Sequence, residues 1–119
     1  MNISRREFLT LALAGIASTA LYGCNKSPYV SNEMYKLATE TIKYARDADR
    51  NHQLTSAVVA RKLQENADKA KELAAVAPKE ATKDGVISTL IGSIATYSKV
   101  DMQAQAVEAI DRLEEAIER

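Results

Sequence analysis

Apolar residues recur every three or four positions along most of the chain after residue 32, and this spacing restricts the fold more than any other feature. A helix turns about 100° per residue, so side chains at that spacing lie on one face, which must be packed against another element. The first such stripe is Met34, Leu37, Ala38, Ile42, Ala45 and Ala48. The pattern predicts an all-α domain in which each helix buries one face.

Two further stripes have the same spacing. The second is Val59, Leu63, Ala67, Ala70, Leu73, Ala74 and Ala77, and Pro78 ends its helix because the residue before a proline disfavours helical backbone. The last is Met102, Ala106, Ala109, Ile110, Leu113 and Ile117. This last stripe is rotated by about 120° from the continuation of the apolar stripe in residues 87–97, far more than gradual drift along one helix explains. We therefore expect a break at residues 98–101.

Between these two stripes, residues 85–98 contain no charged side chain. Fourteen uncharged residues are too few to span a bilayer, so a core helix is the preferred interpretation and a membrane-dipping or docking segment the alternative. Its stripe is Ile87, Leu90, Ile94 and Tyr97. We expect this helix to be the most buried, with Leu90 and Ile94 packed against Leu63, Leu73 and Leu113. Small residues where another helix could approach are Gly85, Thr89, Gly92, Ser93 and Thr96.

Capping residues precede each expected helix. The candidates are Ser31 or Asn32, Thr55 or Ser56, Thr82 or Asp84, and Asp101. The first two stripes nearly coincide in phase and no Gly or Pro separates them, so one helix over residues 33–77, about 65 Å long, is the alternative. That alternative would give a long helical hairpin. The polar residues His52, Thr55 and Ser56 favour a break, and hence a small antiparallel bundle of four helices.

The first 24 residues follow a different pattern. Arg5 and Arg6 precede an uncharged run from Phe8 to Cys24. This is the order of a secretory signal, with a basic start, an apolar middle and a cleavage zone of small residues. The run is too short for a lasting membrane span. We therefore expect residues 1–23 to be a signal peptide, residues 24–31 a tether and residues 32–119 the bundle domain.

The segment Ser4-Arg5-Arg6-Glu7-Phe8-Leu9 resembles the twin-arginine signal of bacterial Tat export. Arg5, Arg6, Phe8 and Leu9 lie at the offsets of that family, whereas Thr10 stands where its members usually have Lys. The resemblance implies that a Tat receptor reads this segment and that the chain crosses the membrane already folded. A general secretory (Sec) signal is the alternative.

The end of the run, Leu21-Tyr22-Gly23-Cys24, resembles a bacterial lipobox, with Tyr22 bulkier than the usual residue. The resemblance implies cleavage between Gly23 and Cys24 and a thioether-linked diacylglycerol, with fatty chains such as palmitate, on Cys24. The chain would then be anchored to a bacterial membrane, facing the periplasm or the exterior. A plain cysteine is the alternative. Cys24 is the only cysteine, which excludes an intrachain disulfide and a cysteine-cluster metal site.

The charge balance argues against a nucleic-acid partner. The chain has 16 basic and 16 acidic side chains, and removing the signal subtracts only Arg5, Arg6 and Glu7. A nucleic-acid binder normally has a basic excess. Aromatic side chains for base stacking are also few, since only four tyrosines follow Cys24. Six of the acids lie in residues 101–119. We expect this acidic last helix to lie beside more basic helices of the same bundle.

No set of residues predicts catalysis. His52 is the only histidine, and the second His or Glu-x-x-His of di-metal bundles is missing. Met34 and Met102 could bind haem together with His52, which is the alternative of a redox accessory protein; core methionines and a polar junction histidine are preferred. There is no glycine-rich phosphate loop. We expect a non-enzymatic lipoprotein without cofactor or metal, acting as a structural, adaptor or accessory subunit with a protein partner.

Overall fold

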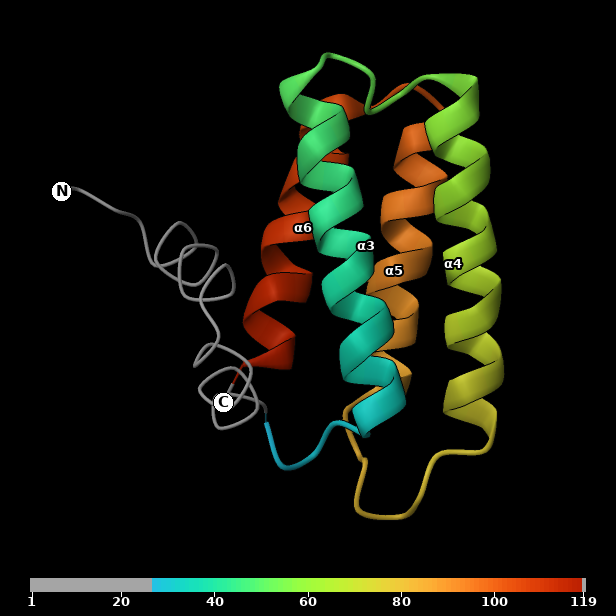
Figure 1. Cartoon of the computed structure of the whole chain (residues 1–119), viewed down its shortest axis with the longest axis vertical. Helices are drawn as coiled ribbons and strands as arrows, with labels where there is room; N and C mark the ends of the chain where they lie inside the picture. Colours follow the sequence, from blue (N-terminus) through green and yellow to red (C-terminus); the bar gives the residue numbers. More distant parts are fainter. Residues whose placement is uncertain (1–26, 119) are drawn as a thin grey trace, which may run out of the picture.

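The computed structural model describes residues 27–118, which form a bundle of four helices (Figure 1). They are α3 (Asn32–Arg50), α4 (Ala57–Ala75), α5 (Asp84–Lys99) and α6 (Gln103–Ile117). Successive helices run in opposite directions, and both α3 and α5 pack against α4 and α6. The predicted antiparallel four-helix bundle is confirmed. The alternative of a single helix over residues 33–77 is wrong.

Most of the predicted stripes form the core. All six residues of the first stripe are buried, as are the first four of the second and the last five of the final stripe. Met102 is exposed, because it precedes the first turn of α6 instead of lying within it. The prediction that it belongs to the core is wrong. Leu73 and Ala74 are only partly buried, and α4 ends at Ala75, before the expected Ala77.

The break between α3 and α4 is a Schellman motif, in which the last carbonyls of a helix accept hydrogen bonds from residues beyond its end. His52 has φ 58°, and its N–H donates to the carbonyl oxygen of Asp49 at 3.0 Å. The N–H of Gln53 reaches back to the carbonyl oxygen of Ala48 at 2.7 Å. This is the bonding pattern of the motif, with His52 in the left-handed position that glycine usually occupies. His52 is therefore a junction residue, as the sequence predicts.

The break between α5 and α6 repeats this geometry. Asp101 has φ 63°, and the N–H of Met102 donates to the carbonyl oxygen of Tyr97 at 2.9 Å. The expected interruption at residues 98–101 is confirmed, but Asp101 does not cap α6. Its backbone ends α5, and Met102 occupies the N-cap position without a side-chain hydrogen bond.

Two of the predicted N-caps are confirmed. The hydroxyl oxygen of Ser31 accepts a hydrogen bond from the N–H of Met34 at 3.2 Å, and that of Ser56 accepts one from the N–H of Val59 at 3.3 Å. Neither Thr82 nor Asp84 caps α5, whose N-cap position is Lys83. Asp84 lies inside the helix, and its carboxylate accepts hydrogen bonds from Ser31.

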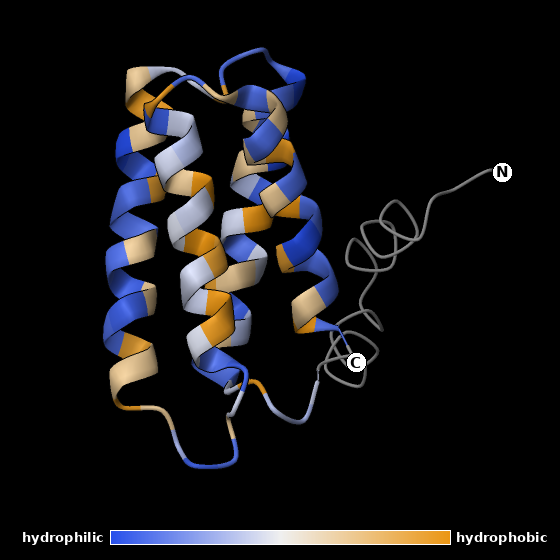
Figure 2. Cartoon of the chain, turned by 180° about the vertical axis from the view of Figure 1, so that it is seen from behind, coloured by the Kyte–Doolittle hydropathy of each residue, from blue (hydrophilic) through white to orange (hydrophobic). Residues whose placement is uncertain are grey.

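One face of α5 is buried and the other is open. Ile87, Ile91 and Ile94 are fully buried, but Leu90 is only partly buried, and Val86, Thr89 and Thr96 are exposed. Six of the 16 residues of α5 are buried, the largest share in any of the four described helices, so the prediction that this helix is the most buried is confirmed. The prediction that Leu90 lies in the core is wrong, because the buried side of α5 contains Ile91 instead. Figure 2 shows its outer side between α4 and α6, with little of the strongly hydrophilic colour of those two helices. Within residues 27–118, no helix is long and apolar enough to cross a membrane.

Candidate functional site

Residues 27–31, expected to be part of a tether, are fastened to the bundle. The N–H of Ser27 donates to the carbonyl oxygen of Ile117, near the end of α6, at 3.1 Å. A tight turn follows, in which the N–H of Val30 donates to the carbonyl oxygen of Ser27 at 3.2 Å and Pro28 takes the second position, which suits its fixed φ. Ser27 and Val30 are both buried. The path of the chain into α3 is therefore fixed from Ser27 onwards.

Asp84 joins this segment to the start of α5. Its carboxylate accepts two hydrogen bonds from Ser31, one from the backbone N–H at 2.9 Å and one from the hydroxyl at 2.6 Å. Asp84 is fully buried, and hydrogen bonds to an ionised carboxylate are among the stronger ones in proteins. A negative charge is also favourable in the first turn of a helix. Ser31 thus caps α3 and holds α5 through the same hydroxyl group.

Lys83 completes the arrangement. Its backbone N–H donates to the carbonyl oxygen of Tyr29 at 2.9 Å, and its ammonium group reaches the carbonyl oxygen of Ala116 at 3.4 Å. We refer to Ser27–Ser31, Lys83, Asp84, Ala116 and Ile117 as the anchor junction. It lies at the lower end of the bundle in Figure 1, where α3 and α5 begin and α6 ends.

The anchor junction fixes the position of the chain, and its described residues show no arrangement of side chains suited to catalysis. Its polar groups bond to one another and to the backbone. The junction fixes where the chain enters the bundle, because Ser27 is hydrogen-bonded to α6 and Ser31 is hydrogen-bonded to α5. A group attached to the chain just before Ser27 is thereby held close to this end of the bundle.

A groove of about 400 Å³ lies between α4 and α5. Gln64, Asp68 and Lys71 of α4 face Thr89, Gly92 and Thr96 of α5 across it. A side chain added at Gly92 would meet nothing within 4 Å, so the groove has free space at its α5 side. Four of the five small residues predicted to allow a close helix contact therefore line an open groove, and the fifth, Gly85, is exposed outside it.

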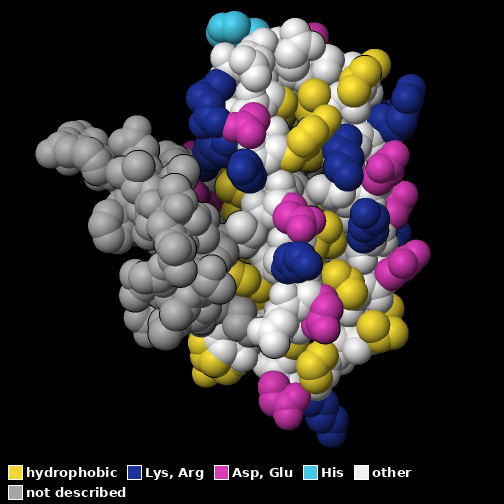
Figure 3. Space-filling model, viewed as in Figure 1, with side chains coloured by type: hydrophobic (Ala, Val, Ile, Leu, Met, Phe, Trp, Pro, Cys, Tyr) yellow, Lys and Arg dark blue, Asp and Glu magenta, His cyan; other side chains and the backbone are white. Residues whose placement is uncertain are grey.

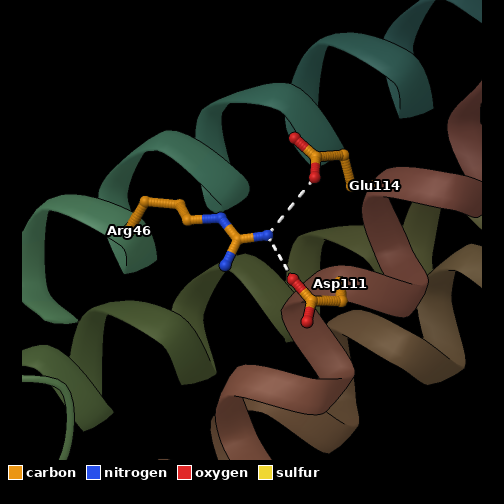
Figure 4. Close-up of polar contacts among 3 residues, drawn as sticks. All are labelled: Arg46, Asp111 and Glu114. Carbon is orange, nitrogen blue, oxygen red and sulfur yellow. Dashed lines mark hydrogen bonds and ion pairs between the residues drawn. The ribbon is translucent and has the colours of Figure 1, made fainter. Parts of the chain in front are cut away.

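The polar contacts between α3 and α6 centre on Arg46 (Figure 4). One guanidinium nitrogen of Arg46 contacts Asp111 at 2.6 Å and Glu114 at 3.3 Å. A basic side chain of α3 thus contacts two acids of the last helix. Asp111 is half exposed, and exposed ion pairs contribute about 0–1 kcal/mol, so its pair with Arg46 is a minor part of the stability. On the face of the bundle in Figure 3, acidic and basic side chains are interspersed.

Two of the residues considered for a haem site, Met34 and His52, lie at opposite ends of α3. Met34 is fully buried in the first turn of α3, whereas His52 is exposed just beyond the last turn of that helix. Eighteen residues at helical rise place them about 27 Å apart, too far for two axial ligands of one haem. Among the described residues, no three His, Cys, Asp or Glu side chains are grouped in a way that could hold a metal ion.

The predicted signal and lipid-attachment residues, Arg5, Arg6, Phe8, Leu9, Gly23 and Cys24, lie outside the described residues. No family model matches the chain, and no curated protein or solved structure matches it either. The function must therefore be argued from the residues themselves.

Sequence reasoning missed the bond between Ser31 and Asp84. The two residues are 53 positions apart, and their pairing depends on which helix ends meet. An acid at the start of one helix and a serine cap before another predict a hydrogen bond between them only if the helices are assumed to be antiparallel. Under that assumption, both fall at the same end of the bundle.

Proposed function

We propose that this chain is a lipid-anchored protein of the bacterial cell envelope, with a helical bundle that serves as a non-enzymatic structural, adaptor or accessory subunit. The observation that carries the proposal is the order Arg5-Arg6, uncharged run, Gly23-Cys24, placed directly before a folded domain. Each buried methylene of an acyl chain contributes about 0.8 kcal/mol, so several chains on Cys24 would hold the protein firmly at a membrane.

The bundle suits this role because its core needs no part of the signal. All four helices and their buried stripes lie within residues 32–117. Removal of residues 1–23 would leave the core complete, and the anchor junction would connect it to Cys24. An accessory subunit acts through another protein, so the proposal includes a protein partner held at the membrane surface.

The anchor is tested by the substitution Cys24→Ser in the full chain expressed in bacteria. A serine oxygen does not take the place of the thiolate in thioether formation, so we expect the variant to leave the membrane fraction or to keep its signal peptide. Fractionation and immunoblotting measure both outcomes. The substitution Thr10→Ala serves as a control that alters the signal but keeps Cys24. A Cys24→Ser protein that is processed and retained in the membrane like the wild type would contradict the anchor.

The export route is tested separately. The double substitution Arg5→Lys and Arg6→Lys keeps both positive charges but removes the guanidinium pair that the Tat resemblance implies is recognised. We expect export to stop and the full-length precursor to accumulate in the cytoplasm. Normal export of this variant would replace Tat with Sec and would leave the lipid anchor unaffected.

A further inference from the structure

Three large apolar side chains are exposed at the end of the bundle that carries the anchor junction. Tyr29 is 53% exposed in the turn before α3, Val76 is 79% exposed at the end of α4, and Val86 is 56% exposed in the first turn of α5. All three belong to segments that meet at the lower end in Figure 1. We refer to Tyr29, Val76 and Val86 as the apolar rim.

The chain length between Cys24 and the bundle limits how far this end can be from a membrane. Cys24 precedes Ser27 by three residues, and a fully extended chain covers about 3.3–3.6 Å per residue. A lipid anchor at Cys24 would therefore be held within about 11 Å of the α-carbon of Ser27. Ser27 is itself hydrogen-bonded to Ile117.

The headgroup layer of one leaflet is about 5–8 Å thick, as the difference between total and hydrocarbon thickness gives. A diacylglycerol on Cys24 places the backbone of that residue at this layer. The lower end of the bundle is then within reach of the headgroups, whereas the opposite end is separated from it by the length of α3, about 28 Å.

We propose that the apolar rim rests on the lipid surface, so that the bundle stands on the membrane by the end that carries the anchor junction. This inference rests on the proposed lipid anchor at Cys24. Tyrosine suits such a position because its ring is apolar and its hydroxyl can remain in contact with water or headgroups. The two valines add apolar area that would otherwise stay exposed to water.

The charges near the rim indicate whether the contact with lipid depends on electrostatic attraction. Lys79 and Glu80 are exposed in the connection between α4 and α5, and Lys83 is followed by Asp84. Asp84 is buried, and Glu33 in the first turn of α3 adds a negative charge at this end, so the described residues here have no basic excess. The contact therefore depends on the lipid anchor and on apolar groups, and it needs no excess of anionic lipid.

The test uses single tryptophans, because the chain has none of its own. Val76→Trp reports on the rim. Val58→Trp is the matched control, since Val58 is 70% exposed in the first turn of α4, at the opposite end. Each full-length variant is expressed in bacteria, purified from membranes and reconstituted into vesicles of phosphatidylethanolamine and phosphatidylglycerol. Some of the lipid carries bromine near the headgroup end of an acyl chain.

We expect the indole at residue 76 to enter the boundary layer, which amphipathic groups penetrate by about 5–10 Å. Its emission should shift to shorter wavelength, and bromolipid quenching should be at least roughly twice that of Val58→Trp. Raising the salt concentration should leave this difference unchanged, because no basic excess attracts the rim to anionic lipid.

Other results would overturn the inference in distinguishable ways. If both variants float with the vesicles but are quenched equally little, the anchor stands and the rim is left for a protein or for water. If neither variant floats with the vesicles, the lipid anchor itself is wrong, and the inference falls with it. Quenching at residue 58 but not at residue 76 would mean that the opposite end faces the membrane.

Discussion

Two residues with a positive φ angle end α3 and α5, and neither is a glycine. His52 and Asp101 have φ 58° and 63°. The left-handed conformation costs an ordinary residue about 1–2 kcal/mol, and glycine avoids this cost but loses about 0.4–1 kcal/mol through its freer unfolded chain. We expect His52→Gly and Asp101→Gly each to raise the free energy of unfolding by about 0.5–1 kcal/mol. Thermal or urea unfolding measures the change.

The control for these substitutions is His52→Ala, which keeps the steric cost of a β-carbon and should not stabilise the bundle. Lower stability of both glycine variants would mean that the histidine and aspartate side chains support the breaks in a way that backbone geometry does not explain. The sequence could not predict that His52 and Asp101 adopt a positive φ angle at these two helix ends. Glycine is the usual signal for this motif, and the four glycines of the chain, Gly15, Gly23, Gly85 and Gly92, lie elsewhere.

A buried polar pair joins α3 and α4 at the centre of the core. The side-chain amide of Asn66 donates to the hydroxyl oxygen of Thr41 at 3.0 Å, and that hydroxyl donates to the carbonyl oxygen of Leu37 at 2.8 Å. We expect Asn66→Ala to lower the free energy of unfolding by about 1–3 kcal/mol, because it leaves a cavity and an unpaired acceptor.

Replacing both partners of this pair should cost less than the sum of the single changes. In Thr41→Val with Asn66→Leu, no buried polar group is left unpaired, and apolar side chains fill the space. A double-mutant cycle by chemical denaturation measures the coupling between the two positions. Strict additivity would show that the hydrogen bond between Thr41 and Asn66 contributes nothing to the stability.

At the scale of the helices, two residues of α5 that lie one turn apart, and that the sequence pattern places on the same face, differ in burial. Ile94 is fully buried, whereas Leu90 is only partly buried. We expect Ile94→Ala to lower the free energy of unfolding by about 2–5 kcal/mol and Leu90→Ala to lower it by clearly less. Thermal melts of the two variants decide the order. An equal loss, or a larger loss for Leu90→Ala, would mean that α5 is rotated about its axis relative to the described packing.

The misplaced Leu90 shows where pattern reading fails. In the other helices, charged residues mark the outer face, so the apolar stripe has only one possible phase. In α5 no charge lies between residues 85 and 98, and both Leu90 and Ile91 fit a helical stripe with Ile87 and Ile94. The inner face contains Ile91, which is fully buried. The phase of an uncharged helix is decided by its neighbours, which the sequence does not identify.

At the scale of the whole molecule, the fold was more predictable than the site. Periodic stripes, serine caps and Pro78 were enough to predict four antiparallel helices, because each of these signals is local. The anchor junction depends on bonds such as that between Ser27 and Ile117, at opposite ends of the described chain. Such contacts follow from the packing of the bundle as a whole, and residues 27–31 by themselves resemble an ordinary polar linker.

The account of this protein as a membrane-held bundle depends on one covalent bond, between Cys24 and a diacylglycerol. Mass spectrometry of the full-length gene product isolated from bacterial membranes tests that bond directly. We expect an N-terminal peptide that begins at Cys24 and carries the mass of a thioether-linked diacylglycerol. A chain that still begins at Met1, or a peptide in which the Cys24 thiol is unmodified, would contradict it.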